Sequence, residues 1–214
     1  MIDESKVQAI VAEVLKHLDL QERVKPGQVP VGVSNRHLHV SQADLETLFG
    51  TGYQLKNMKN LSQPGQFAAE ECVIIAGRKG MLDKVRILGP VRPSTQIEIS
   101  MTDSFAIGVT PMVRDSGDTK GTPGCVIIGP KGSVLLKEGV IVASRHIHMH
   151  PKDATKLGCK DLDHVTVKTS GPRSVVYNNV LVRVSEKFAL DFHLDIDEAN
   201  AAALKNGESV EIIR

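Results

Sequence analysis

The chain has 214 residues, enough for one large domain or two small ones with a buried core. Its 26 Lys and Arg residues nearly balance its 25 Asp and Glu residues, so its charge gives no argument for nucleic acid or an acidic membrane as a partner. Cys72, Cys125 and Cys159 form no Cys-x-x-Cys motif, and we interpret them as reduced thiols of a cytosolic protein. Without an apolar run of membrane-spanning length or an apolar block typical of a signal peptide, we expect a soluble intracellular protein.

The first predicted element is an amphipathic helix over residues 3–19, with Asp3 as its N-cap. Its apolar side chains recur at the helical period, at Val7, Ile10, Val11, Val14, Leu15 and Leu18. A Pro- and Gly-containing stretch over residues 26–30 then ends the pattern. We treat residues 1–22 as a separate amphipathic segment that either packs on its own domain or docks on a partner, and the sequence leaves both open.

The motif Arg-His-x-His occurs twice, at residues 36–39 and 145–148, and each copy follows an apolar alternating run. Each copy is therefore predicted to end a β-strand, in which side chains alternate between the two faces. The two histidines of one copy then share a face, with Cα atoms roughly 6.6 Å apart, close enough for both imidazoles to bind one ion. A single His-x-His is more often an ordinary polar pair, but a second copy 109 residues later favours a duplicated metal-binding unit.

A short helix is predicted after each copy of the motif. The first helix, over residues 42–49, begins after Ser41, which is a favourable N-cap. The second begins at Pro151, a residue type favoured in the first turn of a helix. Asp44 and Asp153 lie eight residues after the arginine of each motif and either orient the histidines by accepting a hydrogen bond or serve the helix as caps.

The remaining predicted elements are mostly short strands separated by glycine and proline. Between the two motif copies they lie at 71–76, 84–88, 96–101, 125–128 and 133–136. After the second copy they lie at 165–168, 179–184, 188–195 and 209–212, with one helix at 196–205 that ends before Gly207. Strands at such spacing, with few helices, predict a mainly β fold of the barrel or sandwich type.

Two further residues are candidates for completing the metal sites. His193 lies on the polar face of an alternating strand, and together with His146 and His148 it makes a three-histidine set that leaves a fourth tetrahedral position open, as catalytic zinc requires. Glu98, on the polar face of another strand, is the carboxylate best placed to join His37 and His39. Glu98 on a solvated strand face remains the alternative.

Three more residues are candidates for binding a substrate. Arg92 lies in a rigid loop flanked by prolines, where a guanidinium suits bidentate binding of phosphate or carboxylate, although nothing in the sequence requires that role. Residues 59–70, which begin with Lys59, form a polar, Gly- and Pro-containing stretch that is a binding loop or a plain turn. Phe105 follows the strand of Glu98 and serves either binding or core packing. The sequence contains neither a Walker loop nor a dinucleotide-binding glycine motif.

The chain resembles a known family in four stretches that occur in the same order. They are Gly-Val-Ser-Asn-Arg-His-Leu-His at 32–39, Leu-Ser-Gln-Pro-Gly-Gln at 61–66, the segment 89–98, and Ser-Arg-His-Ile-His at 144–148. From residue 30 to 214 it resembles the PduL-type phosphate propanoyltransferase (phosphotransacylase) family. This resemblance implies an enzyme that interconverts acyl-CoA plus phosphate with acyl phosphate plus CoA. It also implies two β-barrel domains with exchanged segments, one from residues 26–35 plus 144–214 and the other from residues 36–143.

The resemblance further assigns roles to individual residues. It implies two Zn²⁺ ions per chain, Arg92 as the phosphate-holding catalytic residue, and Phe105 and Lys59 as contacts of coenzyme A. One ion would be bound by His37, His39 and Glu98, and the other by His146, His148 and His193. The partners implied are acyl-CoA, phosphate and acyl phosphate in a homo-oligomer of the bacterial cytoplasm. Because relatives work in bacterial microcompartments for propanediol degradation, residues 1–22 are a candidate packaging tag that binds shell or core proteins.

Two other functions use the same residues. A zinc-dependent acyl-CoA hydrolase would use water as the nucleophile and would release thiol without phosphate. A non-catalytic zinc-binding protein would have fully ligated sites and no turnover. The sequence leaves the acyl-chain preference, the native metal and the oligomeric state open, since imidazole binds several divalent ions.

Overall fold

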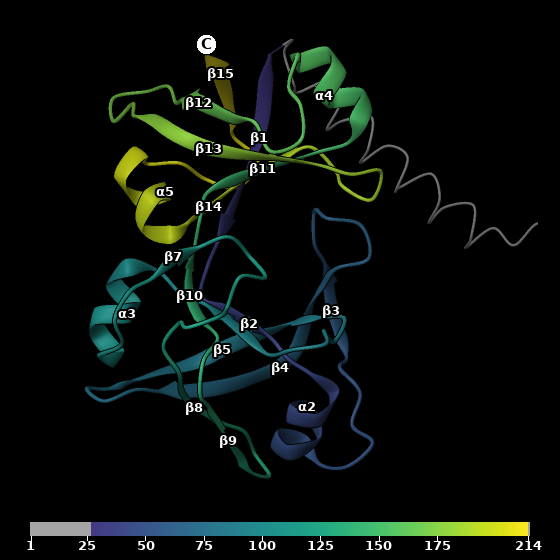
Figure 1. Cartoon of the computed structure of the whole chain (residues 1–214), viewed down its shortest axis with the longest axis vertical. Helices are drawn as coiled ribbons and strands as arrows, with labels where there is room; N and C mark the ends of the chain where they lie inside the picture. The colour runs from purple at the N-terminus through teal and green to yellow at the C-terminus, as the bar shows by residue number, and fades with distance from the viewer. Residues whose placement is uncertain (1–26, 214) are drawn as a thin grey trace, which may run out of the picture.

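The computed structural model describes residues 27–213, so the helix expected over 3–19 and the candidate tag over 1–22 lie outside the described residues. Within that range the chain is mainly β, as predicted, and its strands form two separate sheets, one a closed barrel and the other a larger curled sheet. Figure 1 shows the barrel at one end of the long axis and the curled sheet at the other. No helix in this range is long and apolar enough to cross a membrane.

The closed barrel combines one early strand with the C-terminal part of the chain. In spatial order it contains β1 (Gln28–Ser34), β14 (Asp191–Asp195), β11 (His146–Met149), β13 (Val176–Val184), β12 (His164–Lys168) and β15 (Ser209–Ile213). Strand β1 pairs in parallel with β14 and antiparallel with β15. Its buried core includes Val29, Ile147, Met149, Val182 and Phe192. The barrel therefore closes only because a strand from the start of the chain joins strands near its end.

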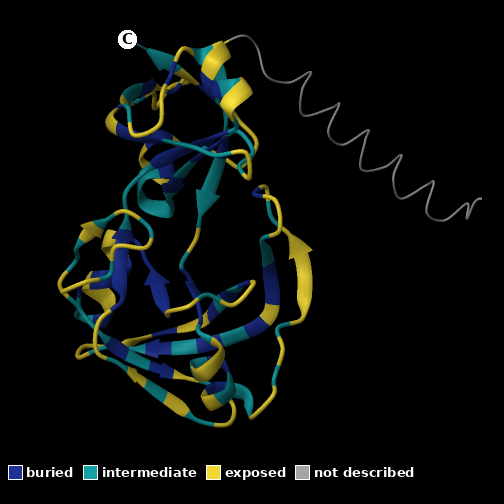
Figure 2. Ribbon diagram, turned by 45° about the vertical axis from the view of Figure 1, so that its right-hand side comes forward, coloured by how far each residue is buried: buried dark blue, intermediate teal, exposed yellow. Residues whose placement is uncertain are grey.

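The second sheet is curled like half a barrel and does not close, which refines the predicted second barrel. Its path runs β7 (Val113–Arg114), β10 (Val140–Ala143), β6 (Gln96–Glu98), β2 (His37–His39), β5 (Met81–Gly89), β4 (Phe67–Ala76), β8 (Cys125–Ile128) and β9 (Ser133–Leu136). Strand β3 (Asn57–Asn60) pairs with β4 outside this path. Figure 2 shows buried residues along the inner strands, whereas β3 is exposed.

The two helices predicted after the Arg-His-x-His motifs are confirmed. Helix α2 (Gln42–Phe49) begins where the Ser41 side chain accepts a hydrogen bond from the backbone N–H of Asp44. Helix α4 (Pro151–Leu157) begins at the predicted proline and ends at Gly158, whose φ of 64° is the left-handed conformation that favours glycine. Each histidine strand therefore leads into a capped helix of similar length.

Three predicted boundaries were wrong, two of them because helix caps end the elements earlier. The strand expected over 96–101 ends at Glu98, since Ser100 and Asp103 form a capping box that starts helix α3 (Met101–Ile107), which the sequence analysis did not predict. Helix α5 (Ile196–Ala202), expected to reach residue 205, ends where Ala203 adopts the left-handed conformation. The strand expected from residue 188 starts only at Asp191, after a turn.

Candidate active site

A cavity of about 1750 Å³ lies where the two sheets meet and is lined by residues of both. All six predicted metal ligands line it, and so do Arg92 and Lys59. Phe105, by contrast, is 62% exposed on helix α3 and is not among the lining residues. The structure thus gathers in one space residues that lie up to 156 positions apart in the sequence, from His37 to His193.

The first cluster consists of His37, His39 and Glu98. Strands β2 and β6 run antiparallel, and their register places His37 directly opposite Glu98. The ligand atoms of the three side chains lie within 4.8 Å of one another, which suits a single metal ion. The Nε2 atom of His37 is 3.5 Å from Glu98 Oε2.

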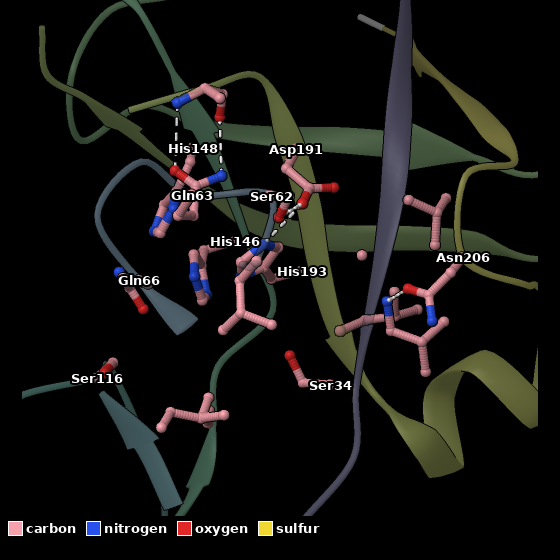
Figure 3. Close-up of a pocket in the computed structure, with 18 of the residues that line it drawn as sticks. Ser34, Ser62, Gln63, Gln66, Ser116, His146, His148, Asp191, His193 and Asn206 are labelled. Carbon is pink, nitrogen blue, oxygen red and sulfur yellow. Dashed lines mark hydrogen bonds and ion pairs between the residues drawn. The ribbon is translucent and has the colours of Figure 1, made fainter. Parts of the chain in front are cut away.

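The second cluster consists of His146, His148 and His193, and its construction repeats that of the first. Strands β11 and β14 run antiparallel with His146 opposite His193, and the ligand atoms again lie within 4.8 Å. Figure 3 shows the three imidazoles close together in the cavity. In both clusters the third ligand lies two residues before the N-cap of a helix, Ser100 or Asp195.

Backbone carbonyls orient the first histidine of each motif. The Nδ1 atom of His37 is 2.8 Å from the carbonyl oxygen of Asn35, and that of His146 is 2.8 Å from the carbonyl oxygen of Ser144. These contacts leave Nε2 of each ring as the nitrogen free to bind an ion. The Asp44 carboxylate, a candidate for this orienting role, instead accepts a hydrogen bond from the hydroxyl of Thr95.

The buried histidines are held in the neutral form that binds metals. Burial is the main cause that lowers the pKa of His39 to about 3, of His146 to about 4 and of His148 to about 2. Both ring nitrogens of His148 are buried without a hydrogen-bond partner among the described residues, an arrangement that costs free energy unless something binds them. The donor set and these unpaired nitrogens therefore fit a bound metal ion.

Glu98 is ionised and firmly oriented. Burial alone would raise its pKa, but the neighbouring imidazoles of His37 and His39 and a hydrogen bond from Ser116 outweigh burial and lower the pKa to about 2. Gln96 Nε2 donates to Glu98 Oε1 at 2.6 Å, and the Ser116 hydroxyl donates to the same oxygen at 2.9 Å. Because both donors use Oε1, Oε2 is directed to the histidine side.

Comparison with known protein families identifies the family to which the chain belongs. The family described as phosphate propanoyltransferase matches residues 30–205, most of the chain. The chain belongs to the phosphate propanoyltransferase family. A phosphate propanoyltransferase of Thermotoga maritima is 59% identical over 192 residues, covering 89% of this chain and 91% of the relative. One of Rhodopseudomonas palustris is 54% identical, covering 89% and 84%, and one of Rhodobacter capsulatus is 49% identical, covering 99% of both chains.

Membership in the phosphate propanoyltransferase family makes the chain an acyltransferase with phosphotransacylase activity. The predicted family resemblance is therefore confirmed. Positively charged side chains that suit phosphate groups line the cavity, among them Arg92 and Arg183. The Arg92 guanidinium forms no hydrogen bond or ion pair with another residue in the described range, and burial lowers its pKa.

The sequence analysis missed Arg183, which lies on β13 directly beside His148. Its guanidinium carbon is 5.9 Å from the centre of the Phe188 ring, and that ring stacks on His148 with centroids 4.2 Å apart. The parallel pairing of β11 with β13 creates this neighbourhood, and sequence alone gives no sign of it. Asp191, which also lines the cavity, was missed for the same reason, whereas Ser62 and Gln63 lie in the stretch 59–70 that the sequence analysis gave as a binding loop or a plain turn.

Proposed function

We propose that the chain catalyses interconversion of propanoyl-CoA, or another short acyl-CoA, plus phosphate with acyl phosphate plus CoA at a site with two Zn²⁺ ions. His37, His39 and Glu98 would hold one ion, and His146, His148 and His193 the other. The observation that carries the proposal is that both clusters and Arg92 line one cavity, so an acyl group and a phosphate can meet between them. Zinc, when bound, supplies a Lewis acid for a carbonyl oxygen and for a thiol.

The residues of the chain supply binding and charge. Arg92 holds phosphate through two parallel N–H donors and directs one phosphate oxygen at the acyl carbonyl carbon. As the new C–O bond forms, the C–S bond breaks, and CoA leaves as a thiolate that takes up a proton. Arg183 adds a second positive charge against the phosphate and the developing oxyanion. The ionised Glu98 offsets part of this positive charge, and no covalent acyl-enzyme is required.

Lys59 and Phe105 are the proposed CoA contacts. Lys59 is exposed on β3 and lines the cavity, where its ammonium group suits a phosphate of CoA. Phe105 is exposed on α3 and does not line the cavity. A CoA contact by Phe105 would therefore lie outside the cavity, on the same chain or on a second copy in the homo-oligomer that we propose.

We further propose two domains, residues 26–35 plus 144–214 and residues 36–143, and a microcompartment location in the bacterial cytoplasm through residues 1–22. Pairing of β1 with β14 and β15 supports the assignment of residues 26–35 to the same domain as residues 144–214. The proposed microcompartment location is tested by attaching residues 1–22 to a fluorescent reporter in a shell-forming host. Punctate fluorescence is the expected result, and diffuse fluorescence would contradict a packaging role.

The first test of the activity is thiol release from propanoyl-CoA by zinc-loaded protein, with and without phosphate. Phosphate-dependent release is the expected result. Release that ignores phosphate would instead identify an acyl-CoA hydrolase with the same metal sites. No release from freshly metallated protein would favour a non-catalytic zinc protein, and longer and shorter acyl-CoA donors in the same assay would distinguish a different acyl preference from that outcome.

A further inference from the structure

The loop between β3 and β4 crosses from the curled sheet to the barrel and is fastened there by three hydrogen bonds. The Ser62 hydroxyl donates to Asp191 Oδ2 at 2.5 Å. Gln63 Nε2 donates to the carbonyl of Ala189 at 3.0 Å, and the Ala189 N–H donates back to Gln63 Oε1 at 3.2 Å. Figure 3 shows these contacts beside the second histidine cluster. Gln63 is 3% exposed, so the loop is packed against the barrel and does not merely lie over it.

Asp191 connects this loop to a candidate metal ligand. The oxygen that accepts from Ser62 is also 3.0 Å from His193 Nε2, and Asp191 is 4% exposed. A methyl group added at Gly32 on the neighbouring strand would lie 2.7 Å from Asp191 Oδ2 and 2.9 Å from a carbon of the His193 ring. The absence of a side chain at Gly32 therefore makes room for the contact between Asp191 and His193.

The contact reverses the orientation found in the other oriented histidines. His37 and His146 use Nδ1 for their backbone contacts, whereas His193 uses Nε2 for Asp191. With Nε2 in contact with Asp191, Nδ1 is the ring nitrogen of His193 that is left to bind an ion. A carboxylate on the opposite ring nitrogen fixes the tautomer of a ligating histidine and raises its basicity.

We propose that Asp191 and Ser62 are positioning residues for the second metal site, with Asp191 holding His193 so that Nδ1 binds the ion and Ser62 anchoring Asp191 from the other sheet. This inference rests on the proposed function, because it requires a metal at His146, His148 and His193. The loop between β3 and β4 would then position a metal ligand as well as line the cavity. Since coupling is reciprocal, an ion at the second site also stabilises the seated loop.

The test is a double-mutant cycle on the full-length protein, read out as Zn²⁺ affinity by competition with a chromogenic chelator. Asp191→Asn should weaken one of the two sites about 10- to 100-fold, in the range found for other residues that orient metal ligands. Ser62→Ala should weaken the same site by a smaller factor. The double variant should bind no more weakly than Asp191→Asn alone, because Ser62 acts through Asp191.

Two control variants separate positioning from general damage. Ser62→Thr keeps the hydroxyl and should retain wild-type affinity, and Ser116→Ala, which removes a donor to Glu98, should weaken the other site instead. Wild-type affinity in both Ser62→Ala and Asp191→Asn, or additive losses in the double variant, would overturn the positioning role. A wild-type protein that binds no zinc at the second site would contradict the proposed function itself, which distinguishes the two failures.

Discussion

Arg36 forms an ion pair with Asp103, with 3.0 Å between Nη2 and Oδ1. Asp103 is the acid of the capping box that starts α3, the helix directly after the Glu98 strand. Arg145 pairs in the same way with Glu198, the capping-box acid of α5, which follows the His193 strand. The arginine of each Arg-His-x-His motif thus ties the start of the histidine strand to the helix that follows the third ligand.

Arg36→Ala should lower the free energy of unfolding by about 1–3 kcal/mol, because it leaves the buried Asp103 carboxylate without its charged donor. The measurement is the urea midpoint at constant m-value. Arg114→Ala is the matched control, since Asp118, the acid of its ion pair, is 59% exposed against 5% for Asp103, and the loss of that pair should cost less than about 1 kcal/mol. Equal urea midpoints for the two variants would show that the Arg36–Asp103 ion pair does not stabilise the fold more than an exposed pair does.

Local patterns in the sequence were enough to predict a strand at each histidine pair and a helix after it. The prediction that each pair ends the strand of the apolar run before it was wrong: β1 lies in the barrel and β2 in the curled sheet, whereas β10 lies in the curled sheet and β11 in the barrel. Alternation of apolar residues and the caps at Ser41 and Pro151 are local signals, and they act within a few residues of each element. The same logic selected Glu98 and His193 from the polar faces of their strands, and the structure brings each of them to its histidine pair. A duplicated motif therefore carries information about two sites at once.

Other features could not be predicted because they depend on long-range pairing. Arg183 reaches the site only through the pairing of β13 with β11, and the Ser62–Asp191 hydrogen bond joins residues 129 positions apart. Helix α3 is a different kind of error. Its capping box at Ser100 and Asp103 was visible, but the alternating pattern was extended through it as a strand.

Lowering the pH should destabilise the metal-free protein below pH 6.5. His39, His146 and His148 have folded-state pKa values of about 3, 4 and 2 against 6.5 when unfolded, so the unfolded chain takes up protons that the folded chain excludes. Stability is therefore unaffected by these groups above pH 6.5 and falls by up to about 1.4 kcal/mol per pH unit for each of them as the pH drops from there toward the folded values. Glu98, with a pKa of about 2, stays ionised in this window.

Urea unfolding of metal-free protein between pH 7.5 and 5 measures this slope. His148→Gln should remove about one third of it, because one of the three buried imidazoles is gone. His164→Gln is the control, since His164 is exposed and should leave the slope unchanged. A slope that does not respond to His148→Gln would contradict the assignment of acid sensitivity to the cluster.

Native protein at pH 8 should leave Cys125 unmodified by a thiol reagent. Burial raises the pKa of its thiol to about 12, so almost no thiolate exists at that pH. Cys72 is partly exposed and is the cysteine expected to react first. Mass spectrometry of the labelled peptides checks this order. Cys72→Ser should remove the fast phase, and a fast phase that persists in that variant would show that a buried thiol is accessible.

Arg92→Ala should lower kcat/KM for phosphate by about 100-fold or more while both zinc ions remain bound. The guanidinium lines the cavity and forms no hydrogen bond or ion pair among the described residues, so its removal should take away the proposed phosphate contact without breaking such a bond. Arg92→Lys should recover little of this loss, because an ammonium group cannot make two parallel hydrogen bonds to phosphate. Steady-state kinetics with varied phosphate and metal analysis of the same preparations provide the measurement.

The matched control is Arg78→Ala, which removes an exposed arginine that does not line the cavity. If overall charge governed the effect of Arg92, both variants would lose phosphate affinity to the same degree, and added salt would reduce the wild-type rate to a similar level. A loss of kcat/KM for phosphate that is confined to the Arg92 variants, with two zinc ions still bound, would support phosphate binding by Arg92. Loss of zinc from Arg92→Ala would instead assign Arg92 to the structure of the metal sites, and the phosphate would then depend on Arg183.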